Sequence, residues 1–149
     1  MPRIERTASL SWEGNAARGT GLMTAGGGAF TELPFSIPSR IAVQQGKTSP
    51  EELLAAAHGG CLTTSIASEL TKAGAPPERL DVTALIVMDE VQGQGHLVVG
   101  SEIDVDARVP GISQAAFDAA VAAADASCPF SILIRASASV TVRARLTAT

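Results

Sequence analysis

The sequence predicts an α+β fold in which pairs of strands alternate with helices, in the order ββ-α-ββ-α-β. Two observations predict this class: apolar and polar residues alternate in hairpin-like pairs of segments, and two segments with helix signals separate these pairs. A doubly wound parallel sheet would instead alternate single strands with helices. A chain of 149 residues buries enough surface for one core, so we expect one domain over residues 1–149.

The N-terminal third is expected to hold a strand pair and then a long loop. Residues 3–12 and 19–25 are predicted as strands joined at the turn signal Glu13-Gly14-Asn15. Residues 26–49 contain three consecutive glycines, two prolines and mixed polar residues, a composition that favours a loop. Ordered loops of this length are often functional.

Residues 50–73 are the clearest element, a long and largely apolar helix. Ser49 is a suitable N-cap, Pro50 suits the first turn, and Glu52 completes a capping box. Gly74 and the prolines that follow it end the helix. Such a helix is about 35 Å long, more than one lobe of this size covers easily. An intertwined dimer would cover it.

The remaining chain is predicted to form two strands, a helix and a last strand. The strands cover residues 80–92 and 96–109. Apolar and charged residues alternate along the second, which predicts an antiparallel strand with one solvent-exposed face. A helix with a serine cap follows over residues 113–127, and Cys128-Pro129 ends or kinks it. Residues 137–147 form the last strand.

Composition and charge exclude several classes of partner. The net charge is −4, and lysine and arginine form no cluster, so nucleic acid is not an expected partner. No apolar run approaches the ~20 residues that span a bilayer, and the N-terminal segment lacks the apolar core of a signal peptide. We therefore expect a soluble cytoplasmic protein without a membrane partner.

The two cysteines, Cys61 and Cys128, are the main candidates for chemistry. No CxxC pair exists, which excludes a zinc ribbon or a thioredoxin-type site. Both lie on predicted helices that a compact core would bring together, and a disulfide is possible if their Cα atoms come within about 7 Å. Because structural disulfides are rare in a reducing cytosol, the alternative to two buried structural thiols is a transient, catalytic disulfide.

The residues before Cys61 leave two interpretations open. Gly59 and Gly60 inside a helix cost about 1 kcal/mol each relative to alanine, and they allow either close packing around a buried thiol or access to a reactive thiolate. His58 lies on nearly the same helix face as Cys61. We expect it to be packed and hydrogen-bonded rather than a catalytic base, and the ligand spacing does not support a metal site of His58, Cys61 and Cys128.

Glu51, Arg18 and Arg40 are candidates for activating a thiolate. In the simplest interpretation, Glu51 complements the helix dipole and both arginines are solvated loop residues. In the functional one, an arginine lowers the pKa of a cysteine while a carboxylate holds the guanidinium. Glu51 precedes Cys61 by ten residues, or roughly 15 Å along the helix. If both serve one site, Glu51 comes from a second subunit.

Two motifs resemble the OsmC/Ohr family of thiol-dependent organic hydroperoxide reductases. They are Ser-Pro-Glu-Glu-Leu-Leu-Ala-Ala-Ala-His-Gly-Gly-Cys at residues 49–61 and Ser-Cys-Pro-Phe-Ser at residues 127–131. The opening Trp12-Glu13-Gly14 looks like the OsmC branch, and the family more often has alanines where this chain has Gly59-Gly60. The resemblance covers nearly the whole chain. It implies antiparallel sheets around two long central helices, in an intertwined homodimer with two sites at the interface.

The resemblance also implies residue roles. Cys61 matches the peroxidatic cysteine and Cys128 the resolving cysteine. Glu51 matches the glutamate that orients an arginine. In the OsmC branch this arginine should be Arg40, in the loop before the helix, whereas in the Ohr branch Arg18 would be the nearest candidate. We expect Arg40 to be the activating arginine.

Together these residues predict a thiol-dependent peroxidase. Cys61 attacks the distal peroxide oxygen, releases an alcohol and becomes a sulfenic acid, with which Cys128 condenses to a disulfide. An external dithiol, for which the family suggests a lipoylated protein, then restores both thiols. The apolar composition favours organic hydroperoxides over hydrogen peroxide, and no metal or other cofactor is needed. Two alternatives remain: a non-enzymatic thiol redox sensor or binding protein, and a cysteine hydrolase or acyl transferase that uses His58.

Overall fold

The computed structural model describes residues 3–42 and 46–147. The chain divides into two compact units, Met1–Leu53 and Leu54–Thr149. Each unit contains one three-stranded sheet together with helix, which confirms the α+β class. The single domain expected over residues 1–149 stays a prediction.

The first unit contains an antiparallel sheet in the order β1-β2-β3. Its strands are β1 (Ala8–Glu13), β2 (Thr20–Ala25) and β3 (Leu33–Phe35). The expected turn is confirmed, with Gly14 at a φ of 90°, but the first strand begins at Ala8 and not at residue 3. A Cβ at Gly21 would lie 2.2 Å from the ring of Phe35, so glycine at this position lets β3 pair with β2.

Residues 26–49 are not one loop, contrary to the prediction. They contain β3 and the short helix α1 (Ile37–Ile41). Ser36 caps α1 by accepting from the amide of Ser39, whose hydroxyl accepts from the Ser36 amide in return and donates to the carbonyl of Thr48. The glycines and prolines of the segment obscured this capping box, which begins a helix of only five residues. Residues 43–45 lie outside the described residues.

Helix α2 (Pro50–Lys72) begins and ends where the sequence predicts. The hydroxyl of Ser49 accepts from the amide of Glu52 at 3.1 Å. The carboxylate of Glu52 accepts from the hydroxyl of Thr48 at 2.8 Å, whereas a capping box predicts the Ser49 amide as its donor. Gly74 has a φ of 76°, in the left-handed region that favours glycine, and this conformation ends the helix.

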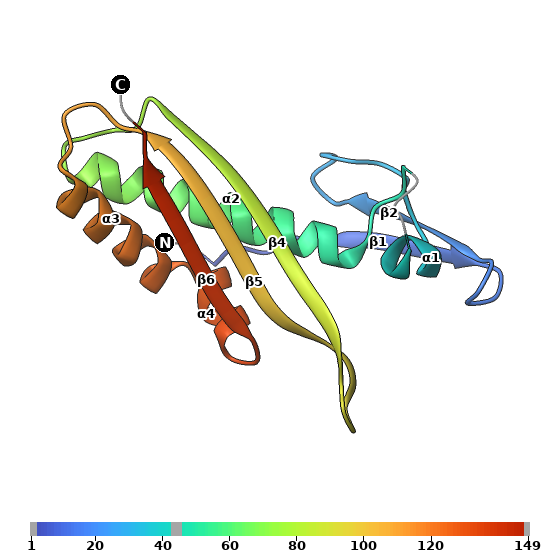
Figure 1. Ribbon diagram of the computed structural model, residues 1–149. Helices are drawn as coiled ribbons and strands as arrows, with labels where there is room; N and C mark the ends of the chain where they lie inside the picture. Colours follow the sequence, from blue (N-terminus) through green and yellow to red (C-terminus); the bar gives the residue numbers. More distant parts are fainter. Residues whose placement is uncertain (1–2, 43–45, 148–149) are drawn as a thin grey trace. The chain divides into compact units, whose positions relative to one another are not determined.

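The second unit contains a mixed sheet, which corrects the implied antiparallel arrangement (Figure 1). Its strands are β4 (Arg79–Val91), β5 (Gly95–Arg108) and β6 (Ser139–Leu146). β4 and β5 are antiparallel, as predicted, but β6 runs parallel to β5. The reason is the connection: α3 (Gln114–Ser127) and α4 (Pro129–Arg135) carry the chain back along the sheet before β6 begins, and parallel strands require such a crossover.

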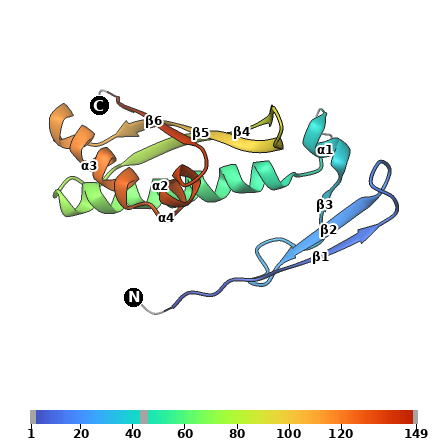
Figure 2. The same cartoon turned by 90° about the horizontal axis from the view of Figure 1, so that it is seen from below.

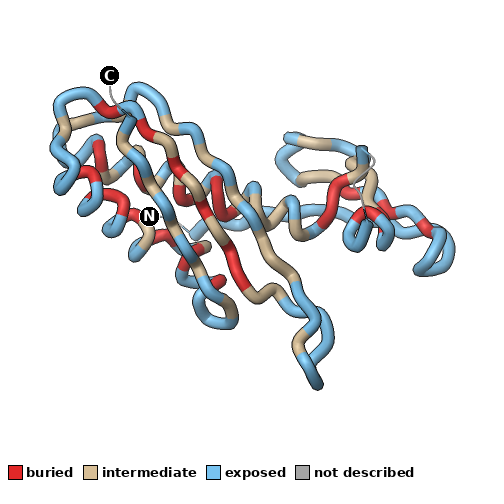
Figure 3. Tube along the Cα trace, viewed as in Figure 1, coloured by how far each residue is buried: buried red, intermediate tan, exposed pale blue. Residues whose placement is uncertain are grey.

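Helices α3, α4 and the part of α2 in this unit cover one face of the β4-β5-β6 sheet (Figure 2). Buried positions recur along β5 and α3 (Figure 3). The core consists mainly of aliphatic side chains around one phenylalanine: Leu62, Ile66, Leu70, Ile103, Val105, Ala107, Val109, Phe117, Ala120, Val121, Ala124 and Cys128. Cys128 ends α3 and begins α4, which meet at 65°, so the interruption predicted at Cys128-Pro129 is confirmed.

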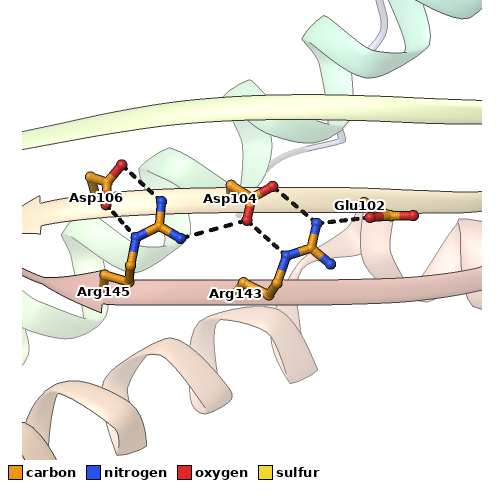
Figure 4. Close-up of polar contacts among 5 residues, drawn as sticks. All are labelled: Glu102, Asp104, Asp106, Arg143 and Arg145. Carbon is orange, nitrogen blue, oxygen red and sulfur yellow. Dashed lines mark hydrogen bonds and ion pairs between the residues drawn. The ribbon is translucent and has the colours of Figure 1, made fainter.

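The exposed face of β5 and β6 carries a ladder of ion pairs (Figure 4). Arg143 lies 2.8 Å from Asp104 and 2.7 Å from Glu102, and Arg145 lies 2.7 Å from Asp106. Asp104 and Asp106 are the register partners of Arg143 and Arg145. Because opposite charges directly across two strands are favourable and like charges are not, the ladder favours this register of the parallel pair.

The ladder predicts an acid-dependent loss of stability. Hydrogen bonds from Arg143 lower the pKa of Asp104, and hydrogen bonds from Arg145 lower the pKa of Asp106. A carboxylate with a depressed folded pKa stabilises the fold above its unfolded pKa, about 3.9, and this stabilisation is lost as pH falls through the folded value. We expect the urea midpoint to decrease between about pH 5 and pH 2.

Asp104→Asn should lower the midpoint modestly at neutral pH, because exposed pairs contribute little, and should flatten its decrease in acid. Asp89→Asn, at an exposed aspartate of β4 outside the ladder, is the control. A profile for Asp104→Asn that runs parallel to the wild-type profile would contradict this role of the ladder.

Candidate functional site

The two cysteines meet in the second unit. Cys61 lies in the middle of α2 and Cys128 at the junction of α3 and α4, and their Sγ atoms are 3.4 Å apart as free thiols. The core brings them together, since Leu62 of α2 and Ala124 of α3 belong to the same buried cluster. Because a disulfide has an S–S distance of about 2 Å, a small movement of the side chains would join the two sulfurs.

The two thiols differ in access and in ionisation. Cys61 is partly exposed, whereas Cys128 is fully buried. Burial and the neighbouring Cys128 thiol raise the pKa of Cys61. Burial also raises the pKa of Cys128, but Ser131, Cys61 and Phe130 together outweigh it, and the pKa lies below its ordinary value. Within this pair the surroundings therefore favour a negative charge on Cys128 over one on Cys61. A thiolate on Cys61 needs a further positive charge beside it.

Arg40 and Glu51 form a close ion pair in the first unit. Arg40 lies in the last turn of α1 and Glu51 in the first turn of α2. The Nε and Nη2 atoms of Arg40 are 3.0 Å and 2.5 Å from Oε1 of Glu51. Burial raises the pKa of Glu51, but the hydrogen bond from Arg40 helps to hold it below its usual value.

The arginine that Glu51 holds is thus the one that the sequence favours, although the catalytic roles of both residues stay predictions. Arg18 lies in the turn between β1 and β2, where its amide donates to Asn15 Oδ1 at 3.0 Å.

His58 is fully buried, and both of its ring nitrogens have a serine partner. Nδ1 lies 2.7 Å from Ser101 Oγ, and Nε2 lies 2.8 Å from Ser131 Oγ. Burial lowers the pKa of His58 and favours the neutral ring. The prediction of a packed, hydrogen-bonded histidine is therefore confirmed. A histidine with both nitrogens engaged is poorly placed as a base for Cys61, which argues against a hydrolase or acyl transferase.

Sequence reasoning missed the two serines around His58. Ser131 is the last residue of the Ser-Cys-Pro-Phe-Ser motif, so its proximity to a cysteine could have drawn attention to it. Ser101 is a buried serine within β5, and its sequence neighbours give no comparable signal.

Gly59 and Gly60 have different surroundings. The two interpretations of this pair, close packing and open access, therefore apply to different glycines. A Cβ at Gly59 would lie 3.1 Å from the Cβ of Ala84, which means that α2 packs closely on β4 at this position. A Cβ at Gly60 would meet no described atom within 4 Å apart from its own helix backbone. Close packing therefore accounts for Gly59, and open space surrounds Gly60.

This difference gives opposite expectations for two alanine variants. Gly60→Ala should stabilise the fold by about 0.8–1 kcal/mol, because alanine favours the helix and the added methyl meets no neighbour. Gly59→Ala should gain less or become destabilising, because Ala84 must move to admit the methyl group. Urea unfolding of both variants measures the difference, and equal stabilisation by the two substitutions would contradict this account of Gly59.

Within residues 3–42 and 46–147, no three His, Cys, Asp or Glu side chains are arranged to hold a metal ion. Over the same residues, no single helix has the length and hydropathy of a membrane span, although α3 and α4, with their 65° bend, meet these criteria as a pair.

Comparison with known proteins supports the resemblance. A family model described as "OsmC-like protein" matches residues 43–143. Peroxiredoxin OsmC of Escherichia coli K12 is 32% identical over 133 residues, which cover 89% of this chain and 92% of that protein.

Solved structures show the same fold. The organic hydroperoxide resistance protein OsmC of Legionella pneumophila superposes with a TM-score of 0.73 at 22% identity, covering 97% of this chain and all of that one. An organic hydroperoxide resistance protein from Elizabethkingia anophelis has a TM-score of 0.75 at 20% identity, with 99% of this chain and 100% of that chain covered. The chain therefore belongs to the OsmC-like protein family and is a cysteine-based peroxidase, with a function in hydroperoxide-related redox chemistry.

Proposed function

We propose that the protein reduces organic hydroperoxides to alcohols through Cys61 and Cys128. The Cys61 thiolate attacks the distal peroxide oxygen, the O–O bond breaks, and the alkoxide takes up a proton and leaves as an alcohol. Cys61 is then a sulfenic acid, and Cys128 attacks its sulfur to form a disulfide and release water. The 3.4 Å distance between the two sulfurs carries this proposal, because the second step needs no rearrangement of the fold.

The assignment of Cys61 as the first nucleophile rests on access. A hydroperoxide can reach the partly exposed Cys61, whereas Cys128 is fully buried. Because burial raises the pKa of Cys61, a nearby positive charge is needed to stabilise its thiolate. We propose that Arg40, held by Glu51, supplies the positive charge. Glu51 precedes Cys61 by ten residues on α2, roughly 15 Å, so the proposal includes a homodimer in which a second copy provides the Arg40–Glu51 pair.

The substrate and reductant complete the proposal. Two structural relatives are described as organic hydroperoxide resistance proteins, which supports an organic hydroperoxide as the substrate. The reductant is a dithiol, either free or as the lipoyl group of a protein. It reduces the Cys61–Cys128 disulfide by exchange and leaves as its own disulfide, which balances the two electrons given to the peroxide.

Steady-state peroxide consumption with a dithiol tests this function. With dihydrolipoamide in excess, the wild-type protein should reduce many equivalents of cumene hydroperoxide, and should do so faster than it reduces hydrogen peroxide. Consumption that stops after one equivalent per chain would contradict the enzyme and favour a redox sensor. A preference for hydrogen peroxide would contradict the substrate class.

A further inference from the structure

A buried row of polar side chains ends at Ser131, three residues after Cys128, and has no role in the reaction proposed above. Ser101 of β5, His58 of α2 and Ser131 of α4 come from three separate elements, and successive side chains are 2.7 Å and 2.8 Å apart. None of the three is more than 1% exposed, and Cys128 is 0% exposed. Burying polar groups is unfavourable unless they are paired, so this row is a costly way merely to fill the core.

The hydroxyl of Ser131 has two neighbours but only one proton. It lies 2.8 Å from His58 Nε2, and it belongs to the first turn of α4, three residues after the N-cap Cys128, whose pKa it helps to lower. If Ser131 donates to Nε2, no proton remains for the sulfur. If Nε2 carries the ring proton, it donates to Ser131, Nδ1 accepts from Ser101, and the Ser131 proton points to Cys128. The neutral Nε2–H tautomer is thus the one that directs the whole row toward Cys128.

We propose that Ser131, oriented by the Nε2–H tautomer of His58 and through it by Ser101, is a positioning residue that donates a hydrogen bond to the Cys128 sulfur whenever that sulfur carries negative charge. This inference rests on the proposed function, in which Cys128 reacts twice. A hydrogen bond to the thiolate increases the fraction of Cys128 that is ionised, and it also makes this sulfur a better leaving group.

Cys128 reacts once when the disulfide forms and once when the disulfide is reduced. In the first, the Cys128 thiolate attacks the sulfur of the Cys61 sulfenic acid, the S–O bond breaks, and the oxygen takes up a proton and leaves as water. In the second, a thiolate of the dithiol attacks Cys61, the more exposed sulfur, and Cys128 departs with the electron pair of the S–S bond. The second thiol of the reductant then displaces Cys61 and closes the reductant's own disulfide.

The ionisation of Cys128 gives the first test. In a Cys61→Ser background, thiolate absorbance near 240 nm against pH reports the pKa of Cys128. Ser131→Ala should raise this pKa by about one unit, the effect of a hydrogen bond to a charged group. Ser127→Ala is the matched control, because this serine also adjoins Cys128 but donates to the carbonyl of Ala123. It should leave the pKa unchanged.

Single-turnover kinetics in the chain with both cysteines give the second test. After one equivalent of cumene hydroperoxide, Ser131→Ala should form the Cys61 sulfenic acid at the wild-type rate and the disulfide about three- to tenfold more slowly. Equal rates of disulfide formation in Ser131→Ala and Ser127→Ala would overturn the role of Ser131 and leave the peroxidase intact. A wild-type protein that forms neither sulfenic acid nor disulfide would instead overturn the proposed function.

The role of His58 is tested in protein that keeps Ser131, so the result does not depend on whether Ser131→Ala folds. ¹⁵N chemical shifts of labelled wild-type protein should show His58 as the neutral Nε2–H tautomer, and the Nδ1–H tautomer would overturn the proposal. His58→Gln places an amide NH₂ close to the position of Nε2, so it should retain much of the rate of disulfide formation. The shorter His58→Asn should lose it, and equal loss in both variants would indicate packing alone.

Discussion

A Cys61→Ser variant is expected to react with organic hydroperoxide roughly a thousandfold or more slowly than the wild-type chain, as removal of a nucleophile does in other covalent catalysts. A serine hydroxyl does not ionise near neutral pH, and thiolate character is what attacks the peroxide oxygen. Cys128→Ser should keep the first reaction, because Cys128 acts only after the alcohol has left. Stopped-flow peroxide consumption measures both rates, and dimedone labels the Cys61 sulfenic acid that accumulates in Cys128→Ser.

This pair of variants decides between two orders of reaction. Within the sulfur pair, the Ser131 amide and hydroxyl favour the charge on Cys128, whereas exposure favours Cys61 as the sulfur that meets the substrate. Loss of the first reaction in Cys128→Ser, with its retention in Cys61→Ser, would reverse the roles that we assign.

Replacing Arg40 with alanine should slow the reaction of Cys61 with peroxide by about 10- to 100-fold at neutral pH, since a nearby opposite charge shifts a pKa by one to three units. The loss should shrink as pH rises, because the thiol of the variant ionises at higher pH. Arg40→Lys should recover only part of the rate, because lysine cannot reproduce the forked contact with Glu51.

Arg18→Ala is the matched control for Arg40→Ala. It should keep the wild-type rate, because Glu51 holds Arg40 in the structure. A loss confined to Arg18→Ala would assign activation to the other arginine and contradict our choice.

Mixing two inactive variants tests whether the arginine comes from a second copy. If Arg40 acts across a dimer, subunit exchange between Arg40→Ala and Cys61→Ser chains creates one complete site, and part of the activity returns. If Arg40 acts within its own chain, mixing restores no activity. That result would contradict the shared site of the proposed homodimer.

Local signals explain what the sequence could predict of the fold. The start and end of α2 depend on neighbouring residues, the Ser49 cap and the left-handed Gly74, so they are visible in the sequence. The alternation along β5 marks its buried face in the same way. The direction of β6 depends instead on the crossover through α4, and no alternation pattern encodes the partner of a strand.

The sequence likewise predicts some features of the site and not others. Cys61 lies on an apolar helix and Cys128 at the end of another, and the expectation that a compact core would bring them together is confirmed by the distance between their sulfurs. The lowered pKa of Cys128 depends in part on Ser131, and a ring nitrogen of His58 has its partner in Ser101, in a strand 43 positions away. These contacts exist only in the folded chain, so sequence patterns do not reveal them.

The most direct test of the central claim is the intact mass of the protein after one equivalent of an alkyl hydroperoxide. The wild-type chain is expected to lose two hydrogen atoms as the Cys61–Cys128 disulfide forms, and Cys128→Ser is expected not to undergo this loss. A wild-type mass that stays unchanged while peroxide remains unconsumed would contradict the account.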